Sequence, residues 1–426
     1  MLARRLPFYY GWVVVAVVFV TMALAVNART AFSLLFPPLL AEFGWERGVT
    51  AGAFSFGFLV SGAMSPLLGR LMDWRGPRVV MELGVFTVGG GMILATYTTQ
   101  PWHLYLSFGV LVGLGSVCVG YSGQSLFLPS WFVRRRGLAM GIAFSGVGIG
   151  SRLLFPWLQR VIERDGWRTA CWDLGLMVLI VLAPLNLLLF RRPEMLGLTP
   201  DGDAASAVAA ARQADIVDPA WAAIDWTLAR AARTARFWWI ALGYFGALFT
   251  FYAVQVHQTK YLVEIGFSPA DAAWALGTVS LAGIPGGIAL GYASDRIGRE
   301  PVWALGCLGF VLTYVCLLLM RETPSQLLLL LMVLVQGMLG YGITSVLGAI
   351  TAEIFEGRHF GVIFGTLFLP ALAGGAIGPW LTGVLHDESG NYVLAFWIAG
   401  GAAVISAVAI WLAAPRQIRR VAGQNG

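Results

Sequence analysis

Residues 69–78 read GRLMDWRGPR and join two long apolar runs of the chain. An Asp lies four residues after the first Gly, a second Gly lies three residues after the Asp, and a charged residue follows two positions later. Residues 291–300, GYASDRIGRE, repeat this spacing 222 residues further on and also join two apolar runs. A spaced pattern that recurs between apolar runs indicates two copies of one structural unit.

Two further matches extend this repeat beyond the loops. Arg136 and Arg358 are also 222 residues apart, and the triplet Pro-Trp-Leu at 156–158 recurs at 379–381, an offset of 223. A near-constant offset at three places predicts an internal duplication. Duplicated halves of a membrane protein are typical of transporters that bind their substrate at the repeat interface.

The composition predicts that both halves consist of membrane-spanning helices. The 426 residues are 58% hydrophobic and 12% charged, whereas soluble domains carry about twice that charged fraction. Apolar runs of about 20 residues are the signature of spanning helices, and a β-barrel shows short alternating segments instead. We therefore expect an all-α membrane protein with twelve spans, six in each half. Their expected limits are 9–40, 49–72, 79–98, 102–132, 137–161, 168–190, 237–264, 270–293, 301–320, 324–355, 359–385 and 392–413.

The charges of the loops predict the orientation of these spans. Loops on one side are rich in arginine, and those on the other are neutral or acidic. The positive-inside rule then places both termini in the cytoplasm of a multi-pass inner-membrane protein. The expected organisation is a six-helix half at 1–190, a cytoplasmic linker at 191–236 and a second half at 237–426. The basic, amphipathic stretch WTLARAARTARFWW at 226–239 predicts a short helix on the inner membrane face.

The repeated loop resembles the signature loop of the major facilitator superfamily, and the resemblance covers essentially the whole chain. It implies two pseudo-symmetric six-helix halves and transport by alternating access. In that family the loop residues lock the cytoplasmic helix ends. By resemblance, the inner gate consists of Asp73, Arg75, Arg78, Asp295, Arg296 and Arg299.

Other stretches resemble bacterial members of the monocarboxylate transporter and oxalate:formate antiporter group. They include FYYGWVVV at 8–15, LAEFGWERGVTAGAFS at 40–55, GWRTA at 166–170 and RRPEMLGLTPDGD at 191–203. The resemblance implies a small organic anion as substrate, often carried with a proton. Animal members have a Lys in the first span near the position of Arg29. The group often has an Arg in span eight, and residues 270–293 contain none.

Two arginines inside the predicted spans point to an anion site. Arg29 interrupts FVTMALAVNARTAFSLLFPPLL at 19–40, and a central Arg costs an isolated spanning helix at least about 2.5–3.5 kcal/mol. At the repeat offset Arg29 corresponds to Phe251 and Arg152 to Gly375, so the duplication requires neither charge. Asp173 is the one acid that we count inside the spans. Because the guanidinium fork pairs bidentately with a carboxylate, we expect Arg29 and Arg152 to bind one.

Neutral side chains and one histidine complete the predicted substrate site. Hydrogen bonds to the anion are expected from Asn27, Tyr121, Gln124, Tyr252, Gln258 and His257. His257 is also the expected proton carrier, because histidine titrates near neutral pH. The alternatives left open are that the amides and hydroxyls only join helices, that His257 is a structural histidine, and that Arg152 pairs with Asp173 or a backbone carbonyl.

The predicted function is proton-coupled uptake of a monocarboxylate or small dicarboxylate by a monomer in the lipid bilayer. Exchange of one anion for another, efflux of amphipathic compounds and ligand sensing without transport remain alternatives. An enzyme is not expected, because the four histidines lack catalytic spacing and the loops lack a phosphate-binding glycine motif. The sequence calls for no cofactor, metal or nucleic-acid partner.

Overall fold

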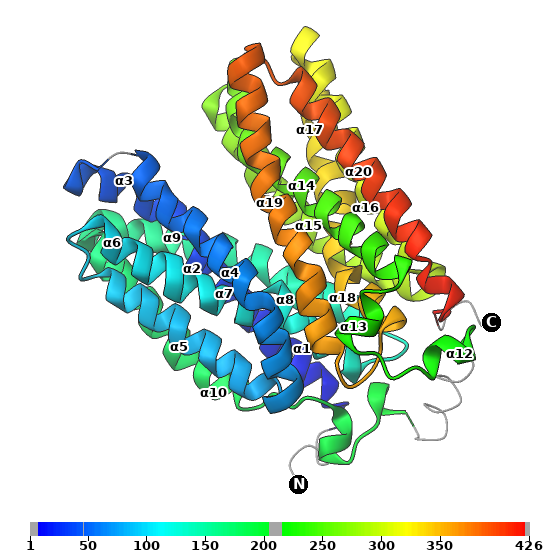
Figure 1. The fold of residues 1–426 in the computed structure, drawn as a ribbon. Coiled ribbons are helices and arrows are strands. Elements are labelled where there is room, and N and C mark those ends of the chain that lie inside the picture. The colour runs from blue at the N-terminus through cyan, green and yellow to red at the C-terminus, as the bar shows by residue number, and fades with distance from the viewer. Residues whose placement is uncertain (1–6, 46, 204–214, 422–426) are drawn as a thin grey trace. The chain divides into compact units, whose positions relative to one another are not determined.

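The computed structural model describes residues 7–45, 47–203 and 215–421, and these residues are almost entirely helical (Figure 1). Eleven helices in this part of the chain are long and apolar enough to cross a membrane. One of them, Arg136–Asn186, has 51 residues and would be about 77 Å long if straight, more than twice a bilayer core. Gly166, with φ 87°, interrupts it. Counted as two, it brings the spans to twelve, and the predicted all-α fold is confirmed.

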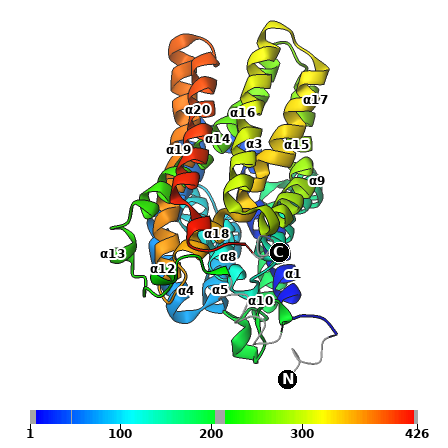
Figure 2. The ribbon, with the colours of Figure 1, turned by 90° about the vertical axis from the view of Figure 1, so that its right-hand side faces the viewer.

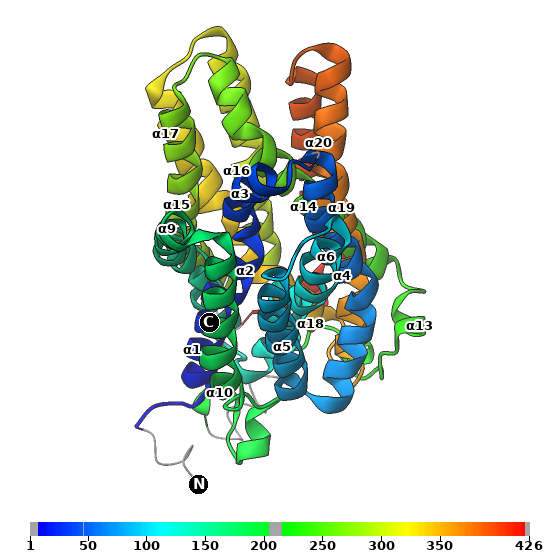
Figure 3. The same ribbon diagram turned by 90° about the vertical axis from the view of Figure 1, so that its left-hand side faces the viewer.

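The first compact unit takes in the described residues within Met1–Phe132 and Ala143–Ala204 (Figure 3). In it, α4 packs against α5 and against the segments η3 and α7. Its elements are α1 Gly11–Thr21, η2 Met22–Val26, α2 Asn27–Thr30, α3 Phe32–Phe43, α4 Arg47–Arg75, α5 Pro77–Ala95, α6 Pro101–Leu104, η3 Tyr105–Val112, α7 Gly113–Val119, α8 Tyr121–Ser125, η4 Leu128–Trp131, α9 Arg136–Met177, η5 Val178–Leu182, α10 Ala183–Asn186, η6 Pro193–Leu196 and η7 Pro200–Gly202.

The second compact unit takes in the described residues within Val133–Ile142 and Ala205–Gly426, and so includes the first turns of α9. Figure 2 shows α14, α19 and α20 of this unit, which pack against one another. Its other elements surround or precede them. They are α12 Pro219–Ala222, α13 Leu228–Ala231, α14 Ala235–Glu264, α15 Pro269–Ile297, α16 Arg299–Glu322, α17 Gln326–Leu334, η8 Val335–Leu339, η9 Gly340–Gly342, α18 Ile343–Ile354, α19 Phe360–Ser389, α20 Val393–Ala413 and η10 Pro415–Gln417.

Glycines allow two pairs of helices to approach closely, in the same way in each unit. A Cβ added to Gly146 would lie 2.2 Å from the Phe19 carbonyl oxygen, and one added to Gly150 would lie 2.2 Å from that of Ala23. In the second unit, a Cβ added to Gly374 would lie 2.1 Å from the Phe245 carbonyl oxygen, and one added to Gly378 would lie 2.4 Å from that of Phe249. Small residues at such seams let backbones pack directly. These seams show that the duplication extends to the packing of individual residues.

Gly374→Ala is expected to lower the free energy of unfolding by about 1–3 kcal/mol, because the methyl group overpacks the α14–α19 seam. The added carbon would meet the backbone carbonyl of Phe245, which cannot rotate away. Thermal unfolding in detergent measures the change. Gly401→Ala on α20 is the control, since a Cβ there meets nothing within 4 Å. Equal stability of the two variants would contradict the close approach.

The stretch GWRTA fixes the start of the sixth span to the end of the first. Arg168 forms an ion pair with Glu42 at 2.6 Å, and the Trp167 indole donates to the same carboxylate at 2.7 Å. Arg168 also donates to the carbonyls of Thr96 and Thr98. Gly166 turns the chain so that these side chains face Glu42. The residues of this motif therefore have a structural role within the first unit.

The linker and the carboxyl-terminal segment meet in the second unit. Ile216 forms an isolated antiparallel bridge with Arg419, and the Val217 amide donates to the Ile418 carbonyl at 2.9 Å. The predicted amphipathic helix at 226–239 is only the single turn α13, followed after Thr234 by the long helix α14. The predicted helix is divided at Thr234, because the hydroxyl of this residue accepts a hydrogen bond from the Phe237 amide and caps the start of α14.

Candidate functional site

Arg29 lies near the middle of the first span, Gly11–Phe43, in the short helix α2 that follows the π-helical segment η2. Its side chain is half-buried and turns toward α4. The guanidinium carbon lies 3.9 Å from the centroid of the Phe58 ring and 5.4 Å from that of Phe54. Both distances fall within the range of a cation–π interaction. The first unit thus holds a cation at mid-span against two aromatic rings.

The glycine seams correct the repeat partner of Arg29. Because Phe19 and Ala23 pack as Phe245 and Phe249 do, the offset in the first span is 226 residues. Arg29 therefore corresponds to Gln255, and its predicted match to Phe251 was wrong by about one helical turn. Gln255 accepts a hydrogen bond from the Tyr341 hydroxyl at 3.1 Å. Both halves thus place a polar side chain here, and only the first half places a charge.

Arg152 is exposed on α9 and forms no hydrogen bond or ion pair with any residue that the structure describes. Gly146 on α9 packs beside Phe19 of the first span. Arg152 is six residues after Gly146 and Arg29 is ten after Phe19. Along the helix axes Arg152 therefore lies about 6 Å short of the level of Arg29. It lies two residues after Gly150, which faces the seam, and so emerges on the opposite side of α9. The structure brings Arg152 and Arg29 to similar depths without placing them in contact.

Further acids lie inside the spans, which corrects the count of Asp173 alone. Glu82 lies in α5, and one of its carboxylate oxygens is buried without a hydrogen-bond partner among the described residues. Glu353 lies near the end of α18, and Glu300 near the start of α16. In the sequence these acids follow basic loops or end apolar runs, where an acid resembles a loop residue. The positive charge of Arg29 and Arg152 is therefore not the only charge inside the helices.

The neutral side chains of the first unit bond or pack against other parts of that unit. Asn27 is buried and its amide donates to the carbonyls of Ala23 at 2.8 Å and Val147 at 3.0 Å. The buried Gln124 donates to the Val119 carbonyl at 3.0 Å, while its own amide oxygen has no hydrogen-bond partner among the described residues. Tyr121 is half-buried, and its ring meets that of Phe144 edge-on. Its hydroxyl remains a proposed ligand.

His257 in the second unit is held at both ring nitrogens. Its Nε2 lies 2.9 Å from the Pro379 carbonyl oxygen, which can only accept, so Nε2 carries a proton. Its Nδ1 lies 3.3 Å from the Tyr392 hydroxyl. A tyrosine hydroxyl can donate to neutral histidine or accept from the imidazolium, so His257 keeps both partners in either charge state.

Gln258 and Tyr252 lie on the same helix, α14, in different environments. Gln258 is fully buried, and neither its amide oxygen nor its nitrogen has a hydrogen-bond partner among the described residues. A buried amide in this state normally bonds to an ordered water or a ligand. Tyr252 is half-buried and packs edge-on against Phe251. These two residues and His257 therefore share one helix but meet different neighbours.

The first signature loop binds a residue that the sequence did not single out. Asp73 pairs with Arg191 at 3.1 Å, and Arg191 also donates to the Asp73 carbonyl. Burial lowers the pKa of Arg191, and the charge of Asp73 opposes that shift. Arg75 stacks on Trp74 and Arg78 on Phe190. The RRPEMLGL stretch that begins at Arg191 pointed only to a family resemblance, yet its first residue is a partner of the loop.

The second signature loop forms a buried charge cluster. Asp295 accepts from the backbone amides of Gly137 and Leu138 at the start of α9, at 2.9 and 3.0 Å. Arg299 pairs with Asp295 at 2.6 Å and with Glu353 at 2.7 Å, and all three side chains are almost fully buried. An acid at a helix start also meets the positive end of the helix dipole. Arg296, in contrast, is exposed and stacks on Tyr292.

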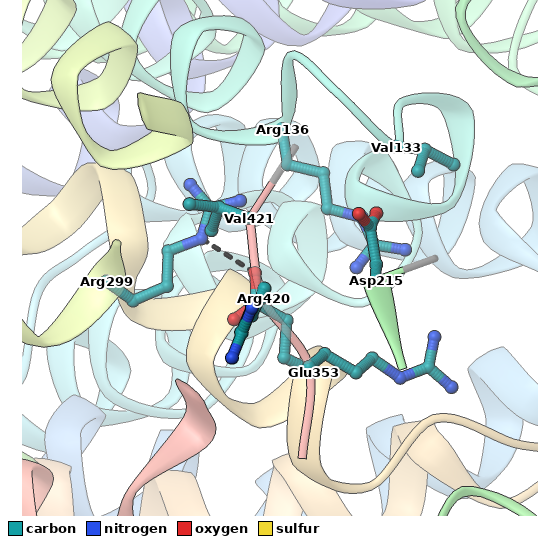
Figure 4. A pocket seen from close by; sticks show the side chains of 8 residues that line it. Val133, Arg136, Asp215, Arg299, Glu353, Arg420 and Val421 are labelled. Atoms are coloured by element: carbon teal, nitrogen blue, oxygen red, sulfur yellow. Dashed lines mark hydrogen bonds and ion pairs between the residues drawn. The ribbon is translucent and has the colours of Figure 1, made fainter. Parts of the chain in front are cut away.

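A small polar pocket lies beside this cluster (Figure 4). The end of α18, the start of α16, the linker and the carboxyl-terminal segment all contribute to it. It is lined by Val133, Arg136, Asp215, Arg299, Glu353, Arg419, Arg420 and Val421. The Arg420 amide donates to the Asp215 carbonyl at 2.7 Å, and Arg419 forms an ion pair with Glu356. The linker and the chain end therefore cover the buried charges of the second loop. The described residues hold no group of three or more His, Cys, Asp or Glu arranged to bind a metal.

The helices, the duplicated signature loops and the buried charges define a membrane transporter. The model of the Major Facilitator Superfamily matches residues 18–348 and 258–425, so the chain belongs to this superfamily. Members are secondary transporters, so the chain is a transporter and not an enzyme, as predicted.

Several known proteins resemble the chain over nearly its full length. Monocarboxylate transporter 13 of Bos taurus is 31% identical over 402 residues, covering 92% of this chain and 86% of the relative. The Rattus norvegicus protein of that name is 29% identical over 394 residues, with the same two coverages. Monocarboxylate transporter 12 of Homo sapiens is 27% identical over 438 residues, covering 97% and 81%. The predicted relation to monocarboxylate transporters is confirmed.

Solved structures show the same fold. The proton:xylose symporter XylE with bound 6-bromo-6-deoxy-D-glucose superposes with a TM-score of 0.72 at 15% identity, covering 95% of each chain. The transporter FucP superposes with a TM-score of 0.66 at 16% identity, covering 94% of this chain and 97% of its own. At these identities the match concerns the fold alone.

Proposed function

We propose that this chain carries a small carboxylate across the cell inner membrane together with a proton, by alternating access, with both termini in the cytoplasm. The observation that carries the proposal is Arg29, a half-buried arginine at the middle of a spanning helix. The names of the relatives, monocarboxylate transporters 12 and 13, support the substrate class. Arg152 is the second proposed cation, and Tyr121, Gln124, Tyr252, Gln258 and His257 are the proposed neutral ligands.

Arginine suits this role better than lysine because its planar fork offers two parallel donors to one carboxylate. Asn27 contributes less directly in this proposal. Its amide protons bond to the backbone of α9 and its own helix, so it sets the position of the helix turn that carries Arg29. The proposal therefore assigns the principal ligand, Arg29, to the first half.

The test is uptake into proteoliposomes that contain the purified protein. Radiolabelled lactate, pyruvate, formate, oxalate, succinate and benzoate are offered one at a time, with and without an inward proton gradient. Accumulation of one acid that stops when the gradient is collapsed supports proton-coupled uptake. Uptake that requires an internal anion and ignores the gradient identifies an exchanger instead. Failure to move any of the six acids would remove the carboxylate proposal.

His257→Gln is expected to abolish accumulation driven by the proton gradient while tracer exchange at equal pH keeps at least about half its rate. Glutamine can still donate to the Pro379 carbonyl, so the α14–α19 contact survives while the titratable group is lost. His386→Gln is the matched control, because His386 contacts Glu264 and Asp387 near the helix ends. Gradient-driven accumulation by His257→Gln at the native level would exclude His257 as the proton carrier.

A further inference from the structure

The aromatic surface beneath Arg29 is built from two turns of α4. Phe54 and Phe58 are four residues apart, which places them on one face of that helix. Their rings meet edge-on, with centroids 5.5 Å apart and an interplanar angle of 82°. Phe32 stacks on Phe54 at 5.4 Å and 19°, and it also meets Phe108. The ring that faces the guanidinium is therefore held in place by a packed cluster rather than by a single contact.

The distances from the Arg29 guanidinium show that Phe58 is the ring in closer contact with the cation. The guanidinium carbon lies over the Phe58 ring at 3.9 Å, close to van der Waals contact, and 5.4 Å from Phe54. A ring face attracts a cation without using any of its N–H groups, which lie in the guanidinium plane. Phe58 therefore contacts the cation without accepting a hydrogen bond from it.

We propose that Phe58 is a positioning residue for the carboxylate site, with Phe54 as its support. The proposal rests on the proposed function. Phe58 holds the guanidinium plane so that one edge of Arg29 meets the substrate carboxylate with two parallel N–H donors. The substrate class that such a site selects is a small acid with one carboxylate directed at that edge.

Fluorinated phenylalanines at position 58 test this role without changing the size of the side chain greatly. Each added fluorine withdraws charge from the ring face and weakens a cation–π interaction. Across a series from phenylalanine to trifluorophenylalanine, KM for the transported acid should rise stepwise, by about 5- to 30-fold in total. The maximal rate should change less than about twofold, because the ring acts on binding. Native protein and each variant are compared in proteoliposomes.

The same series at Phe56 is the matched control. Phe56 lies on the same helix, is exposed, and has Tyr105 as its ring neighbour at 5.9 Å, not the cation. A stepwise rise of KM with fluorination at position 58, together with an unchanged KM at position 56, supports the proposal. If KM does not change across the series at position 58, or rises equally at both positions, the proposal for Phe58 is overturned. Carboxylate uptake by the native protein would still support the transport proposal in that case. Absence of carboxylate uptake by the native protein overturns both.

Discussion

Arg29→Gln is expected to lower carboxylate uptake at least about 100-fold, measured as initial rate over substrate concentration in proteoliposomes. In the proposed site the substitution removes two charge-assisted hydrogen bonds to the anion. Each is worth about 1.5–3 kcal/mol, and tenfold in affinity corresponds to about 1.4 kcal/mol. The stacking on Phe58 is lost as well. Glutamine is uncharged and of similar length, so the α2 helix itself should persist.

Two variants separate the effect on the substrate from an effect on folding. Arg29→Lys keeps the charge but loses the planar fork, so we expect an intermediate loss of about tenfold. Arg160→Gln changes an exposed arginine of α9 that donates to the Pro156 carbonyl, and it should transport normally. If Arg29→Gln unfolds at the native temperature and still transports at the native rate, Arg29 does not bind the substrate.

The second large effect is expected at the buried cluster of the second signature loop. Arg299→Gln should lower the free energy of unfolding by about 3–5 kcal/mol, because it leaves Asp295 and Glu353 buried without their cation. Arg299 is 2% exposed, so water cannot replace the lost partner. Chemical unfolding in detergent, followed by tryptophan fluorescence, measures the change. Arg296→Gln, three residues earlier and exposed, should remain within about 0.5 kcal/mol of the native protein.

A neutralised cluster provides the complementary test. A variant with Arg299→Met, Asp295→Asn and Glu353→Gln removes all three charges, so most of the loss in stability should be recovered. The amide introduced at position 295 would still offer an oxygen to the Gly137 backbone N–H, although without the charge that favours the helix start. If this triple variant is as unstable as Arg299→Gln, the loss arises from packing and not from uncompensated charge.

The fold was predictable because two features that determine it, the apolar runs and the repeated loop, can be recognised in the sequence. Apolar runs of spanning length give the helices, and the repeated loop gives the duplication. The predicted span 301–320, for example, falls within α16, Arg299–Glu322. The repeat offset failed inside the spans for a physical reason. The loops fix an offset of 222, but the glycine seams that set the depth of the first span follow an offset of 226.

The candidate site was less predictable, because residue type does not give side-chain direction. Asn27 and Arg29 are two residues apart, yet Asn27 faces α9 and Arg29 faces α4. Partners distant in sequence were also invisible, such as Arg191 for Asp73. The signature loops identified Asp73 and Asp295, but only the structure shows that Asp295 pairs with Arg299 of its own loop and Asp73 with the distant Arg191.

The pairing of Ile216 with Arg419 joins the linker to the segment that follows α20. The Val217–Ile418 and Arg420–Asp215 hydrogen bonds reinforce this contact. Residues 216 and 419 thus close the long segment between them into a ring held by backbone hydrogen bonds.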